Sequence, residues 1–140
     1  MNEHVHPSAD LTKNQSLVMG ALTKSDGPLS AYTILDQLRD DGFRAPLQVY
    51  RALDKLVEFG MVHRLESLNA FVACRHPGCD DHETIAFMIC ETCSQVDELS
   101  DDALANRLKL LASDASFALK KTTIELRGIC RSCQPPVAVP

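Results

Sequence analysis

Residues 46–73, PLQVYRALDKLVEFGMVHRLESLNAFVA, change from a helical period to a strand period within one short stretch. Pro46 suits the first turn of a helix, and Gly60 is a typical C-terminal stop. Apolar residues recur between them at helical spacing, which predicts a helix with one buried face. That face holds Val49, Ala52, Leu53, Leu56 and Val57, and the opposite face holds Gln48, Arg51 and Lys55.

A hairpin is predicted directly after this helix. Residues 61–65 and 70–73 read as two short strands joined by a turn. Upstream, residues 11–24 and 31–38 carry apolar stripes at helical spacing, and Ser30 is a plausible N-cap of the second helix. Three helices and a hairpin are the layout of a winged helix-turn-helix. A generic three-helix bundle with a hairpin has the same spacing, so the pattern alone leaves DNA binding open.

The second half of the chain has a different character. A polar segment leads into a buried-type strand at residues 85–89, a helix near 101–113 and a final strand near 117–127. Residues 76–140 are acidic and hold five of the six cysteines, whereas the first half is near neutral. We therefore expect an α+β chain with two tasks: a winged-helix domain over residues 1–74, a hinge over 75–84 and a small α/β domain over 85–140.

Composition narrows the class of protein. The chain has 140 residues, 45% of them hydrophobic, and no apolar run reaches the ~20 residues that span a bilayer. Its N-terminus lacks a basic segment followed by an apolar one, so we expect a cytoplasmic protein. Because thiols stay reduced in that compartment, the six cysteines favour metal binding over disulfide bonds. The absence of tryptophan and the 5% of aromatic residues argue against stacking on single-stranded nucleic acid.

Two CxxC pairs, Cys90-x-x-Cys93 and Cys130-x-x-Cys133, are the strongest chemical signal. Each turn places two thiolates within reach of one ion, and two turns complete a tetrahedral shell. Four thiolates with no open position favour zinc held for structure. A redox-active CxxC is the weaker interpretation, because one motif in a thioredoxin-like context would suffice.

Several motifs together resemble the ferric uptake regulator family, and within it the zinc uptake regulator subgroup. The likeness covers about residues 15–133. It rests on the two CxxC pairs and on Ala31-Tyr32-x-Ile34-Leu35, Val49-Tyr50-Arg51-Ala52-Leu53, Gly60-x-Val62-His63 and Glu66-Ser67-x-Asn69-Ala70-Phe71-x-x-Cys74. The resemblance implies a homodimer with an N-terminal winged helix and a C-terminal α/β dimerisation domain. It also implies a zinc-dependent repressor that binds palindromic operator DNA and controls zinc uptake genes.

The resemblance further implies roles for particular residues, with two zinc ions per subunit. Cys90, Cys93, Cys130 and Cys133 would hold a structural zinc, and His63, Cys74, His82 and Glu98 would form a regulatory site. One thiolate, two imidazoles and a carboxylate are a four-coordinate set that suits zinc. Arg51 would read a purine edge, Tyr32 would contact a base or the backbone, and Gln48, Tyr50, Lys55 and Arg64 would position phosphates.

Two alternatives remain at this point. A family member could sense iron, nickel or peroxide, because ligand identity constrains the metal only loosely. A structural zinc-binding adaptor would need no DNA contact, and Arg51 and Lys55 would then be a solvated helix face. A zinc hydrolase or deaminase is not expected, because the deaminase motif is absent. His76 and Cys79 have no assigned role: either could substitute as a ligand of the regulatory site, or both are hinge residues without a role.

Overall fold

The computed structural model describes residues 10–74 and 84–136, which belong to two compact units, Met1–Asp80 and Asp81–Pro140. Most of the predicted hinge lies outside the described residues. So do His76, Cys79 and the predicted ligand His82.

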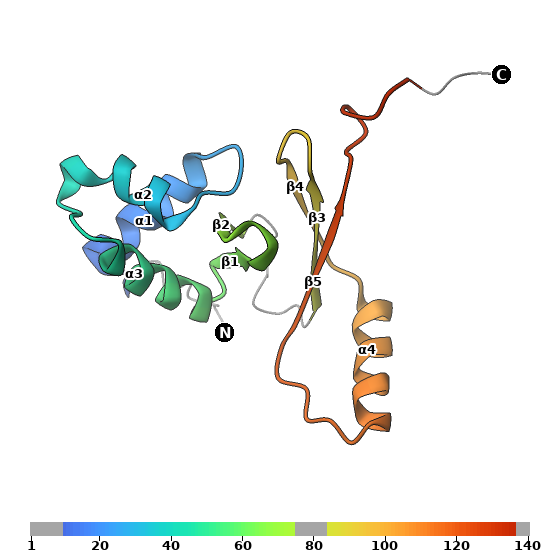
Figure 1. Ribbon diagram of the computed structural model, residues 1–140. Helices are drawn as coiled ribbons and strands as arrows, with labels where there is room; N and C mark the ends of the chain where they lie inside the picture. Colours follow the sequence, from blue (N-terminus) through green and yellow to red (C-terminus); the bar gives the residue numbers. More distant parts are fainter. Residues whose placement is uncertain (1–9, 75–83, 137–140) are drawn as a thin grey trace, which may run out of the picture. The chain divides into compact units, whose positions relative to one another are not determined.

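Helices form most of the first unit (Figure 1). Thr12 begins the first helix with a capping box, in which its side chain and that of Gln15 each accept from the other's backbone N–H. Ser30 caps the second by accepting from the N–H of Thr33 at 3.1 Å, as predicted. No described helix is long and apolar enough to cross a membrane. The helices are α1 (Lys13–Lys24), α2 (Ala31–Gln37), the 3-10 turn η2 (Arg39–Asp41) and α3 (Pro46–Glu58).

The predicted hairpin closes this unit. Strands β1 (Val62–Leu65) and β2 (Ala70–Ala73) pair antiparallel around the 3-10 turn η3 (Glu66–Leu68). Asn69 has a φ of 48°, a left-handed conformation that asparagine tolerates well. Phe71 exchanges two backbone hydrogen bonds with Leu29, which ties the hairpin to the segment before α2. The core beneath includes Val18, Leu22, Ile34, Val49, Leu53 and Leu56, all at most 1% exposed.

The second unit is a three-stranded sheet with one helix. The sheet order is β4-β3-β5, with β4 antiparallel and β5 parallel to the central strand (Figure 1). A parallel neighbour needs a crossover connection, and α4 supplies it. The elements are β3 (Thr84–Cys90), β4 (Val96–Leu99), α4 (Asp102–Asp114) and β5 (Thr122–Gly128).

Two expectations for this unit were incomplete. Strand β4 was not predicted, because its four residues include two acids and it forms by pairing with β3. The final strand begins at Thr122 instead of residue 117, because residues 117–121 have no partner strand in the described sheet.

Candidate metal centre and nucleic-acid interface

The parallel pairing of β3 and β5 brings the two CxxC motifs together. Cys90 is the last residue of β3 and lies opposite Gly128, the last residue of β5. Both chains therefore leave the same edge of the sheet, and each begins its CxxC turn there. The N–H of Glu91 donates to the carbonyl of Gly128 at 2.8 Å, which continues the pairing past the strand ends.

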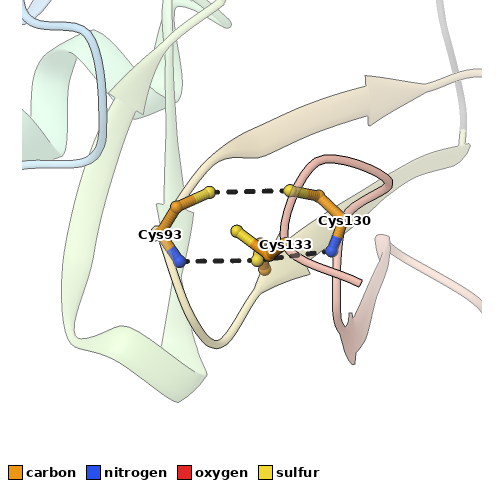
Figure 2. Close-up of side chains that lie close together, drawn as sticks. Cys93, Cys130 and Cys133 are labelled. Carbon is orange, nitrogen blue, oxygen red and sulfur yellow. Dashed lines mark hydrogen bonds between the residues drawn. The ribbon is translucent and has the colours of Figure 1, made fainter. Parts of the chain in front are cut away.

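The four cysteines have the geometry of a tetrahedral thiolate site. Their sulfur atoms all lie within 4.8 Å of one another. The Sγ atoms of Cys93 and Cys130 are 3.7 Å apart (Figure 2). A zinc ion with Zn–S bonds of about 2.3 Å separates its ligands by about 3.8 Å. The number, type and spacing of these donors therefore fit a zinc ion.

Backbone groups prepare Cys90 to be a thiolate. The N–H groups of Cys130, Cys93 and Thr92 donate to its sulfur at 3.3, 3.4 and 3.4 Å. These bonds, first that from Cys130 and then that from Cys93, lower the pKa of Cys90 to about 6 against the opposing effect of burial.

The pKa values of Cys93 and Cys133 are raised, because neighbouring thiols and burial favour their protonated forms. Hydrogen bonds with Cys130 and then Cys93, together with burial, raise the pKa of Cys133 to about 12. The N–H of Gln95 lowers the pKa of Cys93, but interactions with Cys90, burial and Cys130 outweigh it, and the net shift is upward. Four thiolates in this space require a cation.

The hairpin places two further predicted ligands on one face. His63 pairs with Val72, and the N–H of Cys74 donates to the carbonyl of Met61 at 2.8 Å. Side chains two residues apart on a strand share a face, so Cys74 lies diagonally across from His63. Their ligand atoms are within 4.8 Å.

Of the other predicted regulatory ligands, Glu98 lies in the second unit, on β4 opposite Phe87 of β3. It is half-buried. His82 lies outside the described residues. The full set of four therefore remains a prediction.

The exposed face of α3 carries the predicted DNA contacts. Arg51 is exposed and makes no ion pair with any described residue. Lys55, one turn later, pairs with Glu58 at 3.2 Å. The Gln48 side-chain oxygen accepts from the N–H groups of Arg44 and Ala45 at 2.7 and 3.1 Å, so it caps the helix and leaves its amide nitrogen for other contacts. This capping role was not foreseen.

The remaining predicted contacts lie on other elements or are less exposed. Tyr50 is half-buried against the core. Tyr32 projects from α2 with 62% of its surface exposed. Arg64 on β1 lies 3.7 Å from Glu66, with its guanidinium 6.0 Å from the centre of the Phe71 ring. Two of the three predicted arginine and lysine contacts thus pair with a glutamate, whereas Arg51 forms no ion pair within the described residues.

A winged helix-turn-helix unit followed by an α/β unit with a four-cysteine cluster defines a class of metal-binding regulators. The chain belongs to the ferric uptake regulator family, whose model matches residues 8–127. The membership predicted from the sequence motifs is thereby confirmed.

Individual relatives are similar over most of the chain. The zinc uptake regulation protein of Escherichia coli K12 is 39% identical over 124 residues, which are 88% of this chain and 72% of the relative. The crystal structure of holo XcZur matches with a TM-score of 0.80 and 39% identity, covering 88% of this chain and 85% of that one. A zinc uptake regulator complexed with zinc and DNA matches with a TM-score of 0.80 and 38% identity, covering 88% and 82%.

Proposed function

We propose that this chain is a zinc-responsive transcriptional repressor, and not an enzyme, that binds palindromic operator DNA as a homodimer and controls zinc uptake genes. The observation that carries this proposal is the exposed face of α3, on which Arg51 makes no ion pair with a described residue. That face belongs to a fold that matches, at 38% identity, a zinc uptake regulator in complex with zinc and DNA. A repressor acts on chromosomal DNA, so we place the protein in the cytoplasm.

We assign two zinc ions to each subunit. The first would be structural and held by Cys90, Cys93, Cys130 and Cys133, whose sulfur spacing supports it. The second would be regulatory and held by His63, Cys74, His82 and Glu98. Its support is the common face of His63 and Cys74 and the preference of zinc for mixed nitrogen, sulfur and oxygen ligands.

Regulation follows from where these ligands lie in the sequence. His63 and Cys74 belong to the proposed DNA-binding domain over residues 1–74, whereas Glu98 belongs to the dimerisation domain over 85–140. A bound zinc ion supplies a rigid link across the hinge over 75–84. Without that link only a fraction of molecules would present both winged helices at the spacing of successive major grooves, about one helical turn. Operator affinity would therefore report the zinc concentration.

On DNA, we assign direct base contact to Arg51, because a guanidinium can engage a purine edge with two hydrogen bonds. Tyr32 would contact a base or the backbone. Gln48, Tyr50, Lys55 and Arg64 would contact phosphates and fix the register. With a net charge of −5, the chain should bind random DNA weakly and with strong dependence on salt.

The test is Cys74→Ser, compared with the wild type in reducing buffer. A random duplex pool is first enriched for sequences that wild-type protein binds only with zinc. We expect Cys74→Ser to keep its fold and one tightly bound zinc and to lose zinc-dependent binding of the enriched duplex. Unchanged affinity would overturn the regulatory assignment.

Two other functions predict different outcomes in the same experiment. A structural zinc adaptor would enrich no duplex with zinc or with chelator. A regulator of another metal would enrich duplexes with iron or nickel in place of zinc, or without dependence on zinc.

A further inference from the structure

One apolar side chain on α3 faces away from the core. Leu47 is 57% exposed, whereas Val49 and Leu53 of the same helix are fully buried. Single exposed leucines are common on protein surfaces, so exposure by itself says little. The informative feature is the position of Leu47, four residues before Arg51 and eight before Lys55. Residues four apart share a helix face, so Leu47 begins the row that carries the proposed DNA contacts.

The first turn of α3 is held firmly around Leu47. Pro46 precedes it at the first helical position, where its fixed φ favours the helix. Gln48 follows it and accepts from the N–H groups of Arg44 and Ala45. The backbone at Leu47 is therefore fixed on both sides, and its side chain projects from a preorganised platform.

We infer that Leu47 contacts the C5 methyl group of a thymine in the major groove and so contributes to operator specificity. This inference rests on the proposed function, because it requires α3 to enter the major groove. In helix-turn-helix proteins the N-terminal residues of the recognition helix, which is the second helix of the motif, contact base edges. In this chain that helix is α3, and Leu47 lies at its N-terminal end. The thymine methyl is the apolar group that base pairs present in this groove. Against any other base edge, a leucine would displace the water that hydrogen-bonds to the donors and acceptors there, and it could offer no hydrogen bond in place of that water.

The geometry also locates the thymine. Leu47 and Arg51 are separated by about 6 Å along the helix axis, at 1.5 Å per residue. Successive base pairs are about 3.4 Å apart. The thymine should therefore lie within about two base pairs of the purine that Arg51 reads. Burying one methyl-sized carbon contributes about fourfold in affinity, or about 15-fold when both half-sites of a palindrome are counted.

The experiment removes the methyl group from the DNA and the leucine from the protein separately. Full-length, zinc-loaded protein is titrated with the duplex enriched by zinc-dependent selection, in which each symmetric thymine pair is replaced in turn by deoxyuridine. Replacement of purines by 7-deazapurines, compared between wild type and Arg51→Ala, identifies the purine that Arg51 contacts. We expect one thymine pair within two base pairs of it to give about a 15-fold loss for the wild type.

The variants then test whether Leu47 is the contact. Leu47→Ala and Leu47→Gln should bind the thymine and deoxyuridine duplexes equally well. Lys55→Ala, from the same helix row, should bind both more weakly and retain the 15-fold difference. The side chain of Leu47 is outside the core, so thermal unfolding of both variants should match that of the wild type.

Each contrary result has a distinct meaning. If wild-type protein is indifferent to deoxyuridine at every position, or if both Leu47 variants retain the full deoxyuridine penalty, the inference is wrong while the proposed function stands. If no duplex is enriched with zinc, the proposed function fails and the inference fails with it.

Discussion

Arg51 differs from the other basic side chains proposed to contact DNA because no described residue neutralises it. Replacing it with alanine should remove a base contact worth about 1–3 kcal/mol, or about 5- to 150-fold per half-site. Affinity for a random duplex should change little. Fluorescence anisotropy with an operator duplex and a random duplex measures the ratio of the two affinities. Lys55→Ala serves as a control, because it should lower both affinities equally. An Arg51→Ala protein that still discriminates between the two duplexes would show that another residue reads the sequence.

Glu58 should weaken DNA binding through its ion pair with Lys55. The two lie 3.2 Å apart and, with Arg51, line a surface groove of about 660 Å³ between α1 and α3. Glu58→Gln removes a negative charge and leaves Lys55 to contact a phosphate. We expect a several-fold gain at low salt for operator and random duplexes alike. The slope of log affinity against log salt should steepen by about one unit per subunit.

A matched control separates local from overall charge in that experiment. Glu91→Gln makes the same change in net charge in the second unit, at an exposed position. If Glu58→Gln and Glu91→Gln have the same effect on DNA affinity, the Lys55 pair has no specific role.

The four cysteines should couple zinc binding to pH. At pH 7.5 the thiol of Cys90, with a pKa of about 6, is already ionised, whereas Cys133, with a pKa of about 12, and Cys93, with a raised pKa, carry protons. Zinc must displace at least those two protons. Its apparent association constant should therefore rise at least about 100-fold per pH unit near pH 7.5, and the dependence should steepen below pH 6 as Cys90 protonates.

Competition with a zinc indicator across pH 5.5–8 measures this dependence. The Cys74→Ser variant isolates the four-cysteine site, because the proposed regulatory site is lost in it. A slope below two protons per zinc at pH 7.5 would contradict the assigned ionisation states.

Among the secondary-structure elements, α2 depends most on its cap. It has only seven residues, and the side chain of Ser30 satisfies the N–H of Thr33 at its start. Ser30→Ala should lower the free energy of unfolding of the first unit by about 1 kcal/mol. Thermal or urea unfolding measures it, with Thr23→Ala as a control, because the exposed Thr23 hydroxyl bonds only within α1. Equal effects would show that the cap contributes nothing specific.

A helix or strand could be predicted from the sequence where residues within that element favour it strongly. The third helix was predicted from Pro46 to Gly60, and α3 runs from Pro46 to Glu58, because proline, periodicity and glycine act locally. Strand β4 escaped prediction because it has only four residues and includes Asp97 and Glu98. Such a strand is stabilised by pairing with β3, an interaction between residues distant in the sequence.

In the molecule as a whole, the two units should respond differently to loss of zinc. The described buried residues of the second unit are few: Ala86, Phe87, Ile89, Cys90 and Ala105. A four-thiolate zinc contributes an apparent ~10–16 kcal/mol to folding in small domains, so this unit should be much less stable without it. The first unit has a larger apolar core and no part in that site.

Hydrogen exchange after treatment with a strong chelator tests this difference. Amides of residues 84–136 should lose protection, while amides of α1, α3 and the hairpin should retain it. Adding zinc back should restore protection. Equal loss in both units, or protection that survives complete zinc removal, would contradict the proposed structural role.

The sequence by itself determined the ligand types and the local elements: the CxxC pairs, the helix from Pro46 and the turn between residues 65 and 70. These depend on backbone preferences and on atoms a few residues apart. Only the tertiary structure decided that β3 and β5 run parallel, so that both cysteine pairs leave one sheet edge, and that His63 and Cys74 share a hairpin face. Strand order and register depend on contacts between residues distant along the chain, and these form only when the core packs.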